Sequence, residues 1–251
     1  MLSKSKIKLI NSLLQKKQRD ELGLFVAEGP KLILDLLPIF KCKILIATEE
    51  WLTNYPAIQA EEIIVIQAEE FKTISNLKTP QGVFAVFEKS KDQWCIELLP
   101  ENLSLALDDV QDPGNLGTIL RIADWFGIRD VFCSEHCADS FSPKTVQATM
   151  GALARVKVHV VNLPEFIMEC KKSIPIYGTF LDGNDIYTET LTKNGIVVMG
   201  NEGNGISADI EQIINHKLLI PSFPLGAPSS ESLNVGVATA LICAEFRRRI
   251  Y

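Results

Sequence analysis

The sequence predicts an α/β protein made of two units, the second of which is built on a parallel sheet. Segments typical of strands and of helices alternate along the 251 residues. The alternation fails once, over residues 88–102, where the chain is charged and reaches Pro100. Beyond this stretch the strand segments are almost continuously apolar, as in parallel sheets covered by helices on both faces. We therefore expect a first domain over residues 1–90, a linker over residues 91–102 and a second domain over residues 103–251.

The first domain is expected to combine helices with a small set of strands. Apolar residues recur at helical spacing in residues 5–18 and 28–37, which predicts two helices. Runs rich in β-branched and aromatic residues predict three strands, which are CKILIAT from Cys42, EIIVIQA from Glu62 and GVFAVFE from Gly82.

The second domain is expected to start with the strand LSLALDDV from Leu103. The helix behind it should follow a turn at residues 112–114, with Asn115 as its N-cap and Gly127 at its end. Five more apolar runs predict strands, which are VFC from Val131, VKVHVV from Val156, IPIYGTFL from Ile174, GIVVMG from Gly195 and HKLLIP from His216.

The last helix, which runs to about Arg249, has almost no polar face. Its apolar residues spread around most of the helical wheel, so one core cannot cover them all. Small residues such as Gly236, Ala240 and Ala244 would let another helix come close. We therefore expect this helix to pack on its own domain and on a second copy of the chain, in a homodimer.

Composition predicts a cytoplasmic protein without membrane contact. Apolar residues make up 47% of the chain and charged residues 22%, and the sequence shows neither a signal peptide nor an apolar run long enough to span a bilayer. The cysteines are scattered. The one close pair, Cys133 and Cys137, has no second pair that would complete a tetrahedral site, so we expect no metal and reduced thiols.

The net charge of −6 argues weakly against a nucleic-acid partner, but the first 20 residues are basic. This cluster could bind the phosphates of a nucleic acid, and it could equally be the solvated face of an amphipathic helix. Its members are Lys4, Lys6, Lys8, Lys16, Lys17 and Arg19.

Open α/β sheets bind ligands at the carboxyl ends of their strands, where three loops of the second domain are distinctive. The first leads into a helix that carries Arg121 near Gly117, and the third runs from Ile220 to the start of the last helix. The second is GNEGNGIS, residues 200–207, whose glycines expose backbone amides to a ligand. A dinucleotide fingerprint should instead follow the first strand, which argues against a nucleotide-dependent oxidoreductase.

In this order, the three loops resemble the three motifs of the SpoU/TrmH family of RNA 2′-O-ribose methyltransferases. The matching segments are Asn115-x-Gly117-x-x-x-Arg121-x-Ala123, then Gly200-Asn201-Glu202-Gly203, then Ile220-Pro221 with Ser232-Leu233-Asn234-Val235. The resemblance covers about residues 103–249. The first domain resembles the ribosomal-protein-like RNA-binding domain that many members carry, through FVAEGPKLILDLL from Phe25 and TPQGVFAVFE from Thr79.

The resemblance implies a trefoil knot at the C-terminus of the parallel-sheet domain, S-adenosylmethionine bound in that knot, and a homodimer. Gly200, Ile220 and Leu233 match positions that contact the cofactor. The positions linked to catalysis and site integrity are Arg121, Asn115, Glu202, Ser232 and Asn234. The loop from Pro221 to Ser232 is longer than the short form of the family, which affects the expected contacts to the methionine end of the cofactor.

Methyl transfer defines what the protein has to do. The sulfonium of the cofactor already activates the methyl group, so the protein has to align a ribose 2′-hydroxyl and handle its proton. No histidine lies in a motif, which leaves Arg121. Because a guanidinium stays protonated, we expect Arg121 to orient the hydroxyl and stabilise alkoxide charge, while an RNA phosphate or water takes the proton.

Two questions stay open at this point. A non-catalytic RNA-binding protein that keeps the knotted fold is the alternative to an enzyme. The motifs also do not distinguish ribosomal RNA from transfer RNA as the substrate, because RNA is recognised through its shape and its unpaired bases.

Overall fold

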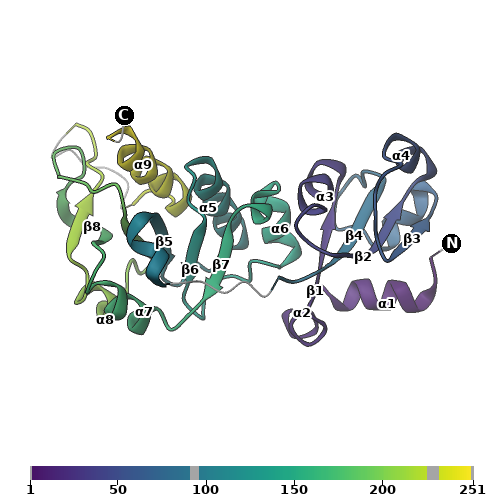
Figure 1. The fold of residues 1–251 in the computed structure, drawn as a ribbon, viewed down its shortest axis with the longest axis horizontal. Coiled ribbons are helices and arrows are strands. Elements are labelled where there is room, and N and C mark those ends of the chain that lie inside the picture. The colour runs from purple at the N-terminus through teal and green to yellow at the C-terminus, as the bar shows by residue number, and fades with distance from the viewer. Residues whose placement is uncertain (1, 91–95, 225–231, 250–251) are drawn as a thin grey trace. The chain divides into compact units, whose positions relative to one another are not determined.

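The computed structural model describes residues 2–90, 96–224 and 232–249, which form two compact units (Figure 1). The first unit comprises Met1–Lys91 and Asp139–Ala154, and the second comprises Asp92–Ala138 and Arg155–Tyr251. Residues 91–95 of the predicted linker and residues 225–231 of the long loop lie outside the described residues. The domain boundaries at residues 90 and 103 stay a prediction.

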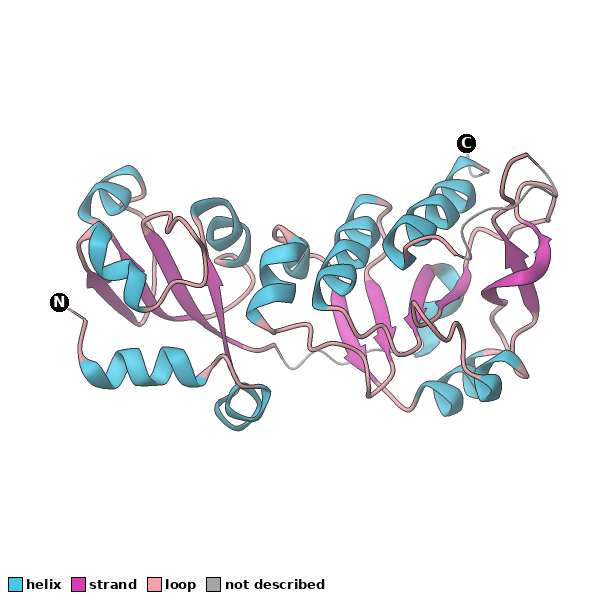
Figure 2. Ribbon diagram, turned by 180° about the vertical axis from the view of Figure 1, so that it is seen from behind, coloured by secondary structure: helices cyan, strands magenta, loops and turns pink. Residues whose placement is uncertain are grey.

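The first unit is built on a four-stranded mixed sheet with the order β1-β4-β2-β3 (Figure 2). Strand β4 pairs antiparallel with both of its neighbours, whereas β2 and β3 are parallel. The bounds of these strands are Leu24–Glu28 for β1, Cys42–Ala47 for β2, Glu62–Val65 for β3 and Val83–Glu88 for β4. The three predicted strands are confirmed as β2, β3 and β4.

Five helices of the first unit come from the N-terminal 90 residues. They are α1 (Lys4–Ser12), α2 (Lys16–Leu22), α3 (Pro30–Leu36), α4 (Glu49–Asn54) and the 3-10 helix η1 (Ala68–Thr73). The prediction of one helix over residues 5–18 is wrong, because Gln15 is extended and separates α1 from α2. The prediction of a helix from residue 28 is also wrong at its start, because strand β1 occupies the stretch between Gly23 (φ 65°) and Gly29 (φ 100°).

A segment from much later in the chain completes the first unit. It contains α6 (Pro143–Thr149) and the 3-10 helix η3 (Ala152–Ala154), and its contacts include β1 and α3. The Phe141 ring lies 4.9 Å from the ring of Phe25, and Val146 and Leu153 are buried. Residues 139–154 therefore contribute side chains to the hydrophobic core of the first unit, although the sequence places them in the second domain.

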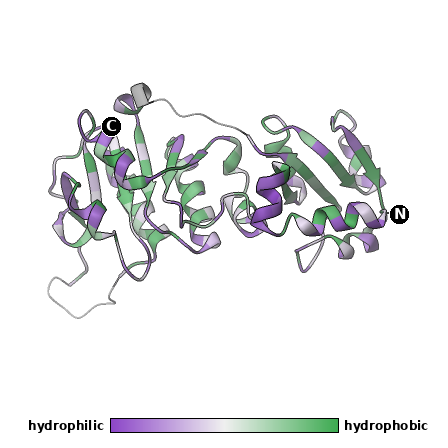
Figure 3. Ribbon diagram, turned by 90° about the horizontal axis from the view of Figure 1, so that it is seen from below, coloured by the Kyte–Doolittle hydropathy of each residue, from purple (hydrophilic) through white to green (hydrophobic). Residues whose placement is uncertain are grey.

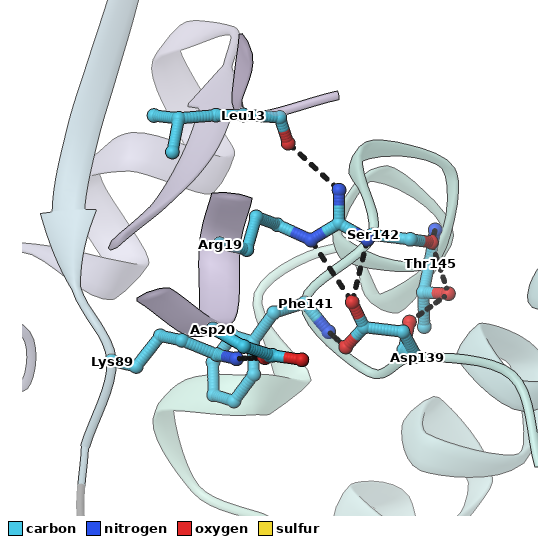
Figure 4. Close-up of polar contacts among 8 residues, drawn as sticks. All are labelled: Leu13, Arg19, Asp20, Lys89, Asp139, Phe141, Ser142 and Thr145. Atoms are coloured by element: carbon cyan, nitrogen blue, oxygen red, sulfur yellow. Dashed lines mark hydrogen bonds and ion pairs between the residues drawn. The ribbon is translucent and has the colours of Figure 1, made fainter. Parts of the chain in front are cut away.

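A buried ion pair fixes this segment to α2 (Figure 4). The Arg19 guanidinium donates to Asp139 Oδ2 through Nε at 2.9 Å and through Nη2 at 2.6 Å, and its Nη1 donates to the Leu13 carbonyl at 2.7 Å. The other oxygen of Asp139 accepts the backbone N–H of Phe141 at 2.9 Å. Nearby, Lys89 pairs with Asp20 and lies 5.1 Å from the centroid of the Phe141 ring.

The second unit is built on a six-stranded parallel sheet with the order β10-β8-β9-β5-β6-β7. The strands are β5 (Leu103–Leu107), β6 (Asp130–Cys133), β7 (Lys157–Val160), β8 (Ile176–Asp185), β9 (Gly195–Met199) and β10 (His216–Leu219). All six predicted strands are confirmed, and so is the fold class of a parallel-sheet domain with a smaller α/β domain before it.

Helices cover both faces of this sheet, whose strands are mainly hydrophobic (Figure 3). Helices α7 (Leu163–Cys170) and α8 (Ala208–Glu211) pack on one face with Ala106, Ile196 and Val198. Helices α5 (Pro113–Trp125) and α9 (Val235–Arg248) pack against each other on the opposite face (Figures 1 and 2). The 3-10 helix η2 (Ile96–Glu101) precedes β5.

Candidate active site

The loop after β5 positions α5 and the polar residue Asn115. Asp112 is the N-cap of α5, because its Oδ1 accepts the backbone N–H of Asn115 at 2.8 Å and Pro113 occupies the first turn. The prediction of Asn115 as the N-cap is therefore wrong. Gly127 (φ 65°) follows the C-cap residue Phe126, so the helix ends where predicted. Because Asp112 caps the helix, the side chain of Asn115 is available for other partners.

Three predicted site residues form one chain of hydrogen bonds across three loops. Asn115 Nδ2 donates to Glu202 Oε1 at 2.7 Å, and Asn115 Oδ1 accepts from Asn234 Nδ2 at 2.9 Å. Asn234 is itself the N-cap of α9, where its Oδ1 accepts from the backbone N–H of Gly236 at 3.0 Å. The loops after β5 and β9 and the start of α9 are thus joined by side chains that the three motifs supply.

Arg121 is exposed on α5, one turn after the buried Gly117. Within residues 2–90, 96–224 and 232–249, no hydrogen bond or ion pair of its side chain is found. Asp124, three residues further along, binds Arg155 at 2.8 Å instead. The guanidinium of Arg121 is therefore not committed to a structural partner in the described part of the chain.

A cavity of about 450 Å³ lies at the carboxyl ends of β9 and β10. The three predicted cofactor residues, Gly200, Ile220 and Leu233, all line it, together with Glu202 and Ser232. This volume is in the range of small-molecule sites. The structure therefore brings the second and third motifs to one cavity, while Arg121, Asn115 and Asn234 are not among its lining residues.

Sequence reasoning missed one wall of this cavity. Thr179, Phe180 and Leu181 of β8 also line it. Strand β8 reaches the cavity because it lies between β9 and β10 in the sheet. The predicted strand IPIYGTFL contains these residues, but the strand order that makes them neighbours of the glycine loop cannot be derived from the spacing of motifs.

The glycine loop forms a tight closed turn. The backbone N–H of Asn201 donates to the carbonyl of Gly205 at 2.9 Å, and the reverse bond is 3.0 Å long. A Cβ at Gly200 would lie 2.3 Å from the carbonyl carbon of Gly205 and 2.4 Å from the nitrogen of Ile206. Since those atoms are backbone, a glycine is required at residue 200.

The members of the predicted RNA-binding cluster differ in their exposure and in their ion pairs. Lys4, Lys8 and Lys16 are exposed, and Lys17 lies 3.8 Å from Glu21. Lys6 binds Glu62 on β3. Arg19 is buried in its ion pair with Asp139.

Helix α9 has two apolar faces. One face is buried in its own unit and includes Val235, Ile242 and Phe246. The other leaves Val237 51% and Leu241 40% exposed. The sequence predicts that this helix has more apolar surface than its own core covers. The exposed Val237 and Leu241 agree with that prediction.

No metal centre is found in the described part of the chain. There, no group of three His, Cys, Asp or Glu residues could hold a metal ion. Cys133 and Cys137 are free, and the thiol of Cys137 donates to the Leu107 carbonyl at 3.3 Å. A hydrogen bond from Cys133 lowers the pKa of the Cys137 thiol.

No helix among the described residues is long and apolar enough to cross a membrane.

A six-stranded parallel sheet with a ligand-sized cavity at its carboxyl edge, and polar side chains from three loops beside it, defines an α/β protein with an enzyme-like site. The chain belongs to the SpoU rRNA Methylase family, whose model matches residues 102–244. Residues 4–85 match the MRM3-like substrate binding domain. The predicted resemblance is therefore confirmed for both parts of the chain.

Relatives match over nearly the whole length. The 23S rRNA (guanosine(2553)-2′-O)-methyltransferase RlmP of Bacillus subtilis is 31% identical over 248 residues, which cover 96% of each chain. The structure of a TrmH-family protein from Porphyromonas gingivalis is 42% identical, with a TM-score of 0.90 and 99% of each chain covered. The AdoMet-bound rRNA methyltransferase from Sinorhizobium meliloti is 32% identical, with a TM-score of 0.86 over 100% of this chain and 97% of that chain.

Proposed function

We propose that this protein transfers a methyl group from S-adenosylmethionine to a ribose 2′-hydroxyl of ribosomal RNA. Its membership of the SpoU rRNA Methylase family confirms the predictions of an RNA methyltransferase and of this cofactor. Ribosomal RNA is favoured over transfer RNA because the Bacillus subtilis relative, which matches 96% of the chain, is named for a 23S rRNA nucleotide. The same relative favours catalysis over the alternative of a non-catalytic RNA-binding protein.

The residues around the cavity fit S-adenosylmethionine. The cavity has a volume of about 450 Å³, and most of its walls come from glycine-rich backbone and apolar side chains. Gly200, Ile220 and Leu233 would hold the cofactor, largely through backbone groups. When bound, S-adenosylmethionine supplies a methyl group that its sulfonium has already activated.

The protein's own residues align the ribose hydroxyl and stabilise its charge. The Arg121 guanidinium stays protonated and has no structural partner among the described residues, so it is available to orient the 2′-hydroxyl and to stabilise developing alkoxide charge. An RNA phosphate or water takes the proton. Asn115, Glu202 and Asn234 hold the motif loops together, and Ser232 lies on the cavity wall.

The exposed face of α9 supports a homodimer. Leu233, Val237 and Leu241 expose apolar side chains on this helix or at its start, and Trp125 on the neighbouring α5 is 85% exposed. A second copy of the chain would cover this surface. The trefoil knot remains part of the proposal as well, because the path of the chain through residues 225–231 lies outside the described residues.

The basic residues of α1 and α2 are proposed to bind RNA phosphates. Four lysines of these helices are exposed, namely Lys4, Lys8, Lys16 and Lys17. Lys6 lies on α1 together with Lys4 and Lys8. Arg19 is left out of this proposed surface because its guanidinium is buried and paired. A cytoplasmic location completes the proposal and stays a prediction from composition.

The test of this function is Arg121→Ala. The variant should lose at least about 100-fold in kcat/KM for methyl transfer to ribosomal RNA, or about 2.7 kcal/mol of transition-state stabilisation. Its affinity for S-adenosylmethionine should stay within about twofold of wild type, and its melting temperature should not change, because the side chain is exposed. Tritium transfer from labelled cofactor, titration calorimetry and thermal unfolding measure the three quantities.

Arg155→Ala is a matched control, since Arg155 is also an exposed arginine and binds a residue of the same helix. This control should keep its transfer rate within about threefold of wild type. An Arg121→Ala variant that retains a rate within about tenfold of wild type would contradict the role of Arg121. A wild-type protein that methylates no ribosomal RNA would contradict the proposed function itself.

A further inference from the structure

Two aspartates that follow β5 hold the glycine loop at both of its ends. Asp108 is buried, and its Oδ2 accepts the backbone N–H of Ser207 at 2.7 Å. Its own backbone N–H donates to the Met199 carbonyl at 2.9 Å. Asp108 thus binds the last residue of β9 and the residue before α8, which are the two points where the chain enters and leaves the loop of residues 200–207.

Asp109 holds the same loop through Asn201. The side-chain Nδ2 of Asn201 donates to the Asp109 carbonyl at 2.8 Å. The Oδ1 of Asn201 accepts the backbone N–H groups of Gly203 at 2.9 Å and of Asn204 at 3.0 Å. Because one amide side chain makes all three bonds, the orientation of the turn depends on where the Asp109 carbonyl points.

The backbone of Asp109 is fixed in turn by Ser134, which follows β6. Asp109 has φ 56°, in the left-handed region that non-glycine residues seldom adopt. Its backbone N–H donates to Ser134 Oγ at 2.9 Å, and the Ser134 hydroxyl donates to Asp109 Oδ1 at 2.6 Å. This reciprocal pair stabilises the unusual conformation and so fixes the direction of the Asp109 carbonyl.

None of Asp108, Asp109 and Ser134 lines the cavity, whereas Asn201 and the glycines of the loop do. We propose that Asp108, Asp109 and Ser134 are positioning residues that fix the shape of the loop of residues 200–207 and thereby set the affinity for S-adenosylmethionine. This inference rests on the proposed function, because the loop is the wall on which the cofactor is proposed to bind. The three side chains act through the loop and do not touch the reacting groups.

The experiment compares Asp108→Ala with the conservative Asp108→Asn. Alanine removes the acceptor of the Ser207 N–H, and this variant should bind S-adenosylmethionine about tenfold more weakly in titration calorimetry. Asparagine keeps an oxygen that can accept the same N–H, and its affinity should stay within about threefold of wild type. At saturating cofactor, kcat of Asp108→Ala should stay within about threefold of wild type, so that the loss is seen in KM for the cofactor.

Two further variants complete the test. Ser134→Ala removes the lock on Asp109 and should weaken cofactor binding about threefold to tenfold, and it tests the inference even where Asp108→Ala does not fold. Asp130→Ala is the matched control, because Asp130 begins β6, at the amino end of the sheet, where it binds His159. This control should bind the cofactor as wild type does. Hydrogen exchange of residues 201–207 should accelerate in Asp108→Ala and Ser134→Ala but not in Asp130→Ala.

The outcomes separate the inference from the proposed function. Wild-type protein that binds no S-adenosylmethionine would refute the proposed function. Wild-type protein that binds it, together with Asp108→Ala and Ser134→Ala variants that bind it equally well, would refute the inference alone. A loss of kcat at unchanged cofactor affinity would also overturn it, because the aspartates would then act on the RNA step.

Discussion

Removal of the ion pair between Arg19 and Asp139 should strongly destabilise the first unit. The two side chains are 3% and 12% exposed, so both charges are largely removed from water. After Asp139→Ala, the Arg19 guanidinium would retain the Leu13 carbonyl as its partner within the described residues. The variant therefore leaves a buried charge without its counterion.

The burial of each ion pair ranks the losses expected in the free energy of unfolding. Removing one partner of a buried pair costs about 3–5 kcal/mol, and this is the loss expected for Asp139→Ala. Arg19→Met also removes one partner of the pair and should cost about 3 kcal/mol, the lower end of the same range, because the Asp139 side chain is more exposed than that of Arg19 and keeps its bond from the Phe141 N–H. The control is Lys89→Gln in the same region, where the partner Asp20 is 50% exposed. This surface pair should contribute less than about 1 kcal/mol.

Urea unfolding measures the global losses, and hydrogen exchange in α6 isolates the first unit if the two units unfold separately. The double variant Arg19→Met with Asp139→Leu should recover most of the stability lost in Asp139→Ala, because an apolar pair needs no counterion. An Asp139→Ala variant that loses no more than Lys89→Gln would refute the reasoning. It would show that water reaches the guanidinium of Arg19 in solution.

Three other predictions concern assembly, RNA and pH. Ala240→Arg on the exposed side of α9 should convert a dimer into a monomer or insoluble chain, as measured by sedimentation; a monomeric wild type at high concentration would contradict the proposed interface. Replacing Lys4 and Lys8 by Gln should lower the slope of log affinity against log salt for RNA by about 1.4–1.8, and an unchanged slope would make the cluster a solvated helix face. Glu245 has a pKa below its ordinary value of 4.5, and the main cause is its hydrogen bonds from Arg248. A lowered pKa stabilises the folded state above pH 4.5, and this contribution is lost as pH falls through the folded-state pKa, so Glu245→Gln should destabilise the protein at pH 7 and the loss should shrink as pH falls below 4.5.

The strands of the parallel sheet could be predicted because each is a short apolar run between turn residues. Strand β1 is not among the predicted strands, although the apolar run Leu24–Ala27 is followed by Glu28, Gly29 and Pro30; its boundaries depend on the positive φ of Gly23 and Gly29. Local pattern also fails at Gln15, whose extended backbone splits one amphipathic stretch into α1 and α2. In both places the backbone conformation of single residues decides the boundary, and side-chain periodicity does not report it.

The candidate site could be predicted as a set of residues but not as an arrangement. The motifs identified Gly200, Ile220 and Leu233, and the structure brings these three to one cavity. The β8 wall depends on strand order, which loop spacing does not encode. Asparagine is a good cap, which favours Asn115 as the N-cap of α5, but Asp112 lies directly before Pro113 and takes that role. The identity of the cap decides which contacts Asn115 makes, since its side chain is left to join Glu202 to Asn234.

The segment of residues 139–154 shows why sequence order and packing need not agree. Its apolar side chains fit a helix in either unit, and periodicity cannot tell which core they enter. The deciding contacts are long-range: the ring of Phe141 beside that of Phe25, and the carboxylate of Asp139 on Arg19. A basic residue near the N-terminus is, on charge alone, as suitable for an RNA phosphate as for a carboxylate more than a hundred residues away. Burial separates the two cases, because a guanidinium that is 3% exposed cannot reach a phosphate without breaking its ion pair. The lysines Lys4, Lys8, Lys16 and Lys17 of α1 and α2 are exposed, and the RNA-binding proposal therefore depends on them.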